Sequence, residues 1–112
     1  MIIPKKTSVG SINMEVISLL SCTEAEAIIR KLASIGAIRW SKHCKERMKQ
    51  RDITMPQILN CLSKGKIIEE PCFSHKNGGG YETVVEKYTA GEWLKVVVCI
   101  KLSEELLLIT VY

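Results

Sequence analysis

The chain lacks several features that would assign it to a functional class directly. Its 112 residues contain no apolar run that approaches the roughly 18 residues of a membrane-spanning helix. They contain no internal repeat, and a chain of this length has no room for a second domain. We therefore predict one compact domain over residues 1–112, with no membrane as a partner and with the role of residues 1–21 left open.

Paired and metal-binding cysteines are also lacking. The five cysteines are far apart, with no C-x-x-C motif and no Cys/His ligand spacing, so we expect no disulfide framework, no metal site and no cofactor. Free cysteines suit a reducing compartment, and we expect a cytoplasmic location. Cys44 and Cys99 lie in apolar patterns and are predicted to be small core residues.

Positive charge, in contrast, is concentrated in one segment. Residues 39–51 contain six Lys/Arg against a single acid, Glu46, which gives a net charge of +5, whereas the whole chain carries +4. The usual partner of such a localised positive surface is a phosphate backbone. This segment therefore predicts a nucleic-acid-binding surface.

A helix over residues 40–51 would separate these side chains into faces, at 100° per residue. An apolar stripe consists of Trp40, Cys44 and Met48. A row at the margin between this stripe and solvent, which we call the His/Arg row, consists of His43, Arg47 and Arg51. The lysines that point further outward are Lys42, Lys45 and Lys49. Arginine can grip a phosphate at two points and lysine cannot, so the row and the lysines are predicted to have different roles.

Three short helices are predicted in the first half of the chain. A capping box at Thr23–Glu26 begins the first, which ends at Gly36. The basic helix follows, with Ser41 as its N-cap. A second capping box at Thr54–Gln57, with proline in the first turn, begins the third helix, which ends before Gly65.

After Gly65 the pattern changes from helical to extended. The predicted strands are Lys66–Glu70, Tyr81–Thr89, Trp93–Leu102 and Leu106–Tyr112. Short connections make them an antiparallel meander, and alternation in the third strand produces one apolar face that helices must cover. The fold class is therefore α+β, with N-terminal helices packed on one face of a C-terminal antiparallel sheet.

The other face of this sheet carries Lys95 in mid-strand, where a lysine either is simply solvated or takes part in a site. Further polar groups on the neighbouring strands are Lys87, Tyr88, Thr110 and Tyr112. Their facing depends on strand register, which the sequence pattern leaves open.

One family shares several of these motifs. The run His43–Ile53, with the pattern H-x-x-x-R-M-x-x-R-x-I, is followed by Gly65–Glu69 and by a last strand that ends in Ile109–Tyr112. Together they resemble a bacterial and archaeal family of unknown function built around an H-x-x-x-R-M-x-x-R helix, related to the RelE/ParE toxin superfamily that includes HigB, BrnT and MqsR. The resemblance covers roughly residues 37–112.

The resemblance implies a RelE-like fold and a type II toxin that cleaves RNA, often mRNA, without a metal and is neutralised by an antitoxin protein. Such cleavage needs a group that takes the proton of the ribose 2′-hydroxyl and cations that stabilise the charge on the phosphate. The catalytic residues implied are His43, Arg47, Arg51, Lys95 and Tyr112. From the localised positive charge of residues 39–51, the residues predicted to bind RNA are Lys42, Lys45, Lys49 and Arg39.

Two other interpretations fit the same residues. The basic helix could belong to a non-catalytic module that holds RNA, DNA or an acidic protein, in which case the lysines would matter as much as Arg47. Alternatively, the His/Arg row could be structural and hydrogen-bond to the sheet. No carboxylate partner for His43 is evident in the sequence.

Overall fold

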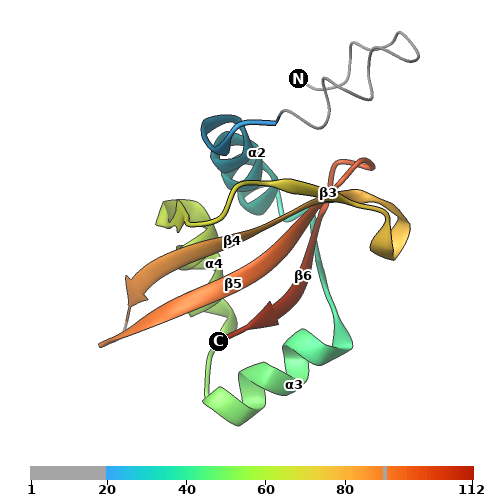
Figure 1. Ribbon diagram of the computed structural model, residues 1–112. Coiled ribbons are helices and arrows are strands. Elements are labelled where there is room, and N and C mark those ends of the chain that lie inside the picture. Colours follow the sequence, from blue (N-terminus) through green and yellow to red (C-terminus); the bar gives the residue numbers. More distant parts are fainter. Residues whose placement is uncertain (1–19, 90) are drawn as a thin grey trace, which may run out of the picture.

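The computed structural model describes residues 20–89 and 91–112, in which helices lie behind and beside one twisted sheet (Figure 1). The uncertain segment 1–21 lies almost entirely outside these residues. The predicted α+β class is confirmed, because three helices precede most of the strands and pack against the sheet. No helix in the described parts of the chain is long and apolar enough to cross a membrane.

Each of the three α-helices in the described residues has a side-chain N-cap. They are α2 (Cys22–Ser34), α3 (Lys42–Arg51) and α4 (Met55–Lys64). Ser41 caps α3 as predicted, and α4 begins with the predicted box, in which Thr54 and Gln57 exchange hydrogen bonds. These caps satisfy amide groups that the first turn of a helix leaves unpaired.

The first capping box was misplaced by two residues. The box that forms joins Ser21 and Glu24, with 3.0 and 3.1 Å between the paired atoms, so the N-cap is Ser21 instead of Thr23 and α2 begins at Cys22. Ser21 and Thr23 are each followed three residues later by a glutamate, so the sequence allows either box, and the structure forms the earlier one.

The sheet has the order β1-β6-β5-β4-β2, and β3 also pairs with β4. Its strands are β1 (Ile38–Trp40), β2 (Lys66–Ile67), β3 (Cys72–Ser74), β4 (Gly80–Thr89), β5 (Glu92–Lys101) and β6 (Leu106–Val111). The antiparallel meander of β4, β5 and β6 is confirmed, and β2 and β3 also pair antiparallel with β4. The short β1 departs from the prediction because it pairs parallel with β6.

Trp40 is the residue most affected by this difference. It ends β1 instead of beginning the basic helix, so the predicted apolar stripe of α3 is reduced to Cys44 and Met48. The expected strand Lys66–Glu70 is shorter, and β1 and β3 were not predicted at all. Segments of two or three residues contain too little periodicity to be recognised, and pairing with a neighbouring strand decides their conformation.

The core lies between the sheet and the helices. The predicted apolar face of β5 is confirmed, since Leu94, Val96, Val98 and Ile100 are all buried against the helices. Cys44 and Cys99 are buried as predicted, although Cys99 alternates to the opposite face of the sheet. That opposite face, which we call the open face, has no described helix packed over it (Figure 1).

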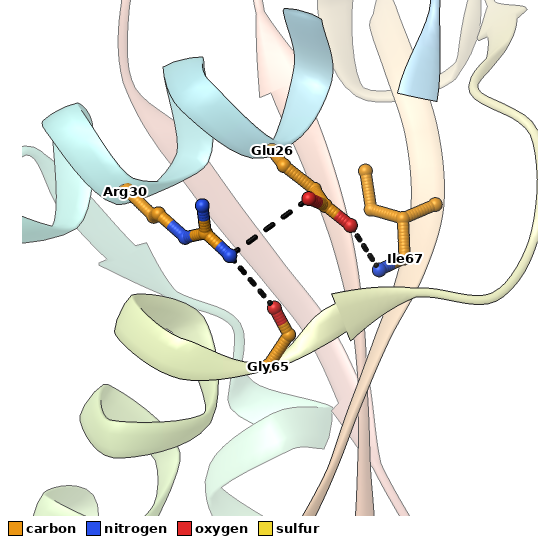
Figure 2. A network of polar contacts seen from close by, with 4 residues as sticks. All are labelled: Glu26, Arg30, Gly65 and Ile67. Carbon is orange, nitrogen blue, oxygen red and sulfur yellow. Dashed lines mark hydrogen bonds and ion pairs between the residues drawn. The ribbon is translucent and has the colours of Figure 1, made fainter. Parts of the chain in front are cut away.

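A polar network fixes α2 to the turn between α4 and β2 (Figure 2). Glu26 accepts a hydrogen bond from the amide of Ile67 at 2.9 Å and forms an ion pair with Arg30 at 3.8 Å. Arg30 in turn donates to the carbonyl of Gly65 at 3.3 Å. The network satisfies backbone groups where α4 passes into the sheet, so it fixes α2, α4 and the edge strand β2 relative to one another.

Candidate nucleic-acid interface

The basic helix α3 lies along the outer edge of β6. The neighbouring strand β1 pairs with β6 only as far as Leu108, so the carbonyls beyond it need other partners. Ser41 supplies the first, because its hydroxyl donates to the carbonyl of Ile109 at 2.9 Å while it also caps α3. Ser41 thus directly follows β1, caps α3 and binds the start of α3 to the edge of the sheet.

Arg47 supplies the second partner for this edge. Its Nε donates to the carbonyl of Val111 at 3.3 Å, and one terminal nitrogen donates to the Oε1 atom of Gln50 at 3.4 Å. A guanidinium has five N–H groups, so three are left over. Arg47 is therefore anchored to the sheet and can still offer donors to an anion.

Tyr112 and Lys95 lie next to this anchor. Tyr112 directly follows Val111, and its backbone exchanges hydrogen bonds with that of Lys95 at 2.7 and 2.9 Å. The Lys95 ammonium lies 5.9 Å from the centre of the Tyr112 ring, within the range of a cation–π interaction. Both side chains belong to the open face, because Lys95 alternates with the core residues of β5.

Arg51 reaches the same end of the sheet from the last turn of α3. Its guanidinium forms an ion pair with Glu92 at 3.9 Å, at the start of β5. Four of the five predicted catalytic residues, from α3, from β5 and from the position after β6, therefore lie around the C-terminal end of β6: Arg47, Arg51, Lys95 and Tyr112.

His43 stands apart from that group. It is exposed in the first turn of α3, one turn before Arg47 and about 12 Å of helix rise before Arg51. Within residues 20–89 and 91–112, no hydrogen bond or ion pair to the His43 ring is present. The three outward lysines are exposed, as predicted: Lys42, Lys45 and Lys49.

Arg39 does not lie on the basic helix. It belongs to β1, opposite Leu107, and its guanidinium forms an ion pair of 2.8 Å with Glu105. Arg39 therefore contributes less free positive charge to the interface than the sequence suggests, because a carboxylate already neutralises it.

Tyr88 and Trp93 lie at the same end of the open face, although the sequence pattern marked Tyr88 only as a polar group whose facing it left open and did not single out Trp93. Their rings form an edge-to-face pair with centres 5.4 Å apart, and both residues are largely exposed. A usable signal was present in the short connection between the two strands. Thr89 pairs with Glu92 across a two-residue connection, and this register places Tyr88 directly opposite Trp93.

The shifted pKa values belong to the core rather than to the interface. Burial raises the pKa of the Cys61 thiol to about 12, and its sulfur lies 3.6 Å from the carbonyl of Val85. Burial likewise raises the pKa of Tyr81 to about 12, and no described group pairs with its hydroxyl. Among the described residues, no group of three or more His, Cys, Asp or Glu side chains could hold a metal ion.

The sequence pattern of one family, described as "Domain of unknown function (DUF4258)", matches residues 40–112. The chain belongs to the DUF4258 family. The matched region begins at the last residue of β1 and includes α3, α4 and the rest of the sheet. No curated protein and no solved structure matches the chain.

Membership of DUF4258 assigns no activity, and its relation to the RelE/ParE toxins stays a prediction. The match does include every residue of the candidate interface except Arg39, which precedes it by one position. For this DUF4258 chain, function must therefore be argued from the interface itself.

Proposed function

We propose that this protein binds RNA through α3 and the adjoining end of β6. The observation that carries the proposal is the convergence of Arg47, Arg51 and Lys95 beside the exposed lysines of α3. Such a group provides arginine donors for individual phosphates, of which Arg47 is anchored, and exposed lysines for diffuse attraction. A cytoplasmic location, as predicted, would place this surface where RNA is abundant.

The test compares two sets of lysines by fluorescence anisotropy with a labelled RNA over a range of salt concentrations. We expect the triple replacement of Lys42, Lys45 and Lys49 by Gln to weaken binding and to flatten its salt dependence. On single-stranded RNA, the log–log slope should fall by about 0.7 for each phosphate that the variant no longer neutralises.

The matched control replaces three exposed lysines outside α3 by Gln, namely Lys31, Lys64 and Lys76. It changes the net charge equally and should retain most of the affinity. Equal losses in both triple variants would show that RNA responds only to net charge, and the proposed interface would be wrong.

A second candidate function, metal-independent RNA cleavage by a toxin of the predicted type, is favoured by one observation. Arg47 is anchored with free donors one helical turn from His43, whose ring has no partner among the described residues. His43 would take the proton of the 2′-hydroxyl, and the 2′-oxygen would attack phosphorus. The bond from phosphorus to the 5′-oxygen would break, leaving a 2′,3′-cyclic phosphate and a 5′-hydroxyl that takes its proton from water. Arg47 would stabilise the charge on the phosphate.

Incubation of RNA with purified protein in EDTA tests this second candidate. We expect fragments with cyclic-phosphate ends, and a loss of about 100-fold or more in rate for His43→Asn with binding unchanged. If RNA stays intact with the wild type, the cleavage candidate is wrong, and the anisotropy titrations alone decide whether the protein binds RNA. A toxin of this type would also have an antitoxin protein as its partner. In cells, expression of the wild type without an antitoxin should slow growth, whereas expression of His43→Asn should not.

A further inference from the structure

An unusual share of the aromatic side chains lies together on the surface. The chain contains only six Phe, Trp and Tyr residues. Three of them are at one end of the open face, with exposed fractions of 54% for Tyr88, 58% for Trp93 and 40% for Tyr112. Exposed aromatic rings that gather on one surface indicate a binding site more often than scattered ones do.

Strand register places these rings on one side of the sheet. Tyr88 pairs with Trp93 across β4 and β5, Lys95 follows two residues after Trp93, and Lys95 pairs in turn with Tyr112. We call this group the aromatic platform: Tyr88, Trp93, Lys95 and Tyr112. No described helix covers it, since α2 and α4 pack on the opposite face and α3 lies at the edge (Figure 1).

The platform adjoins the basic helix. Arg47 of α3 bonds the carbonyl of Val111, which directly precedes Tyr112, and Arg51 reaches Glu92, which directly precedes Trp93. Glu86 lies directly opposite Lys95 on the neighbouring strand β4, and it also pairs with Lys66 of β2, so a lysine stands on each side of this acid. Rings and positive charges are therefore adjacent, as in proteins that bind single strands by stacking bases and holding the backbone.

We propose that the aromatic platform stacks the unpaired bases of single-stranded RNA while α3 holds the phosphate backbone beside it. This inference rests on the proposed RNA binding and names its substrate class. Bases in a duplex are already stacked on one another and present no free faces, so the platform selects unpaired RNA. Every base has a flat π face, so the preference is for strandedness and not for sequence.

Tryptophan fluorescence tests the proposal with little perturbation. The chain has two tryptophans, and Trp40→Phe, at a partly buried position, leaves Trp93 as the single reporter. The ligand is a mixed-sequence RNA of about 12 nucleotides, within the site sizes of single-strand binders. It carries 2′-O-methyl groups to prevent cleavage and is used alone or annealed to its complement.

We expect the single strand to quench Trp93 emission in a saturable manner and to bind at least about five-fold more tightly than the duplex. Trp93→Ala should weaken single-strand binding by about five-fold or more, the lower end of the range for one stacked base. Trp93→Phe, which keeps a ring, should stay within about two-fold of wild type. Leu102→Ala is the matched control, because Leu102 is similarly exposed and lies just beyond the opposite end of β5.

Three results would count against the platform, in different ways. Equal binding of single strand and duplex with unchanged Trp93 emission would refute stacking while leaving RNA binding by α3 intact. Absence of salt-sensitive binding to either RNA would refute both proposals. Thermal unfolding verifies that each variant is folded. If Trp93→Ala is folded and still binds single-stranded RNA like the wild type, this result also counts against the platform.

Discussion

Arg47 has a structural and a proposed binding role in the same guanidinium. Its Nε satisfies a carbonyl at the edge of β6, whereas Arg51 makes only a long ion pair at the protein surface. These two arginines look equivalent in the sequence, four residues apart on one helix face. The structure separates them, because only one of them lies beside an unpaired strand edge.

Methionine replacements should expose this difference. Arg47→Met keeps the apolar stem but removes the bond to Val111, and we expect it to lower the free energy of unfolding by about 1 kcal/mol. Arg51→Met should change it by less than ~0.5 kcal/mol, because exposed ion pairs contribute little. Urea denaturation measures both. Equal destabilisation by the two variants would contradict the anchoring role of Arg47.

Glu92 is expected to oppose RNA binding, since it partly neutralises Arg51. Glu92→Gln should tighten RNA binding at low salt by up to about five-fold, the upper range for an exposed pair. The control is Glu70→Gln, which removes the same charge from an exposed position before β3, on the side of the sheet away from α3. Anisotropy titrations that show the same gain for both variants would assign it to net charge alone.

At the scale of elements, the junction of α4 with β2 depends on one glycine. A Cβ atom at Gly65 would lie 2.5 Å from the carbonyl oxygen of Cys61 and 2.7 Å from that of Glu86. Both neighbours are backbone atoms of packed elements, so they cannot move aside independently. This is also where the network of Glu26 and Arg30 joins the sheet (Figure 2).

Gly65→Ala should therefore destabilise the fold by about 1–3 kcal/mol, as is typical of overpacking. The backbone at Gly65 has a negative φ, so steric overlap and not conformational strain is the cause. Ser63→Ala, at an exposed position of the same helix, serves as the control and should be nearly neutral. A free energy of unfolding for Gly65→Ala within ~0.5 kcal/mol of wild type would mean that the junction can relax.

At the scale of the whole molecule, buried thiols make stability sensitive to alkali. Burial raises the pKa of Cys44, Cys61 and Cys99 above the ordinary value of 9.0, and that of Cys61 reaches about 12. In the folded state these thiols stay protonated at a pH where the unfolded chain loses the protons. Because the folded state binds more protons, stability is complete below pH 9 and falls as the pH rises from there towards 12.

We expect the free energy of unfolding to fall above pH 9 by up to about 1.4 kcal/mol per pH unit for each such thiol. Cys61→Ala should reduce this slope, whereas Cys72→Ala, at an exposed position, should leave it unchanged. Chemical denaturation between neutral pH and pH 10.5 in the presence of a reductant measures the slopes. If Cys61→Ala has the same slope as the wild type, the Cys61 thiol does not cause the loss of stability at alkaline pH.

The sequence by itself determined the features that depend on neighbouring residues. Capping residues and 3.6-residue periodicity gave α3 and α4, and period-2 alternation gave the buried face of β5. The same patterns placed the exposed lysines of α3 correctly and located the cluster of positive charge. Local hydrogen bonding and amphipathicity are enough for these features, because they act over three or four residues.

Only the tertiary structure decided what depends on pairing between distant segments. Trp40 became a strand residue because β6 was there to pair with it. Arg47 became an anchor because β1 ends opposite Leu108 and leaves the Val111 carbonyl free. Register likewise placed Tyr112 beside Lys95, next to the ring pair of Tyr88 and Trp93. Interstrand hydrogen bonds fix that register across up to about 70 residues of sequence, a range that no local pattern spans.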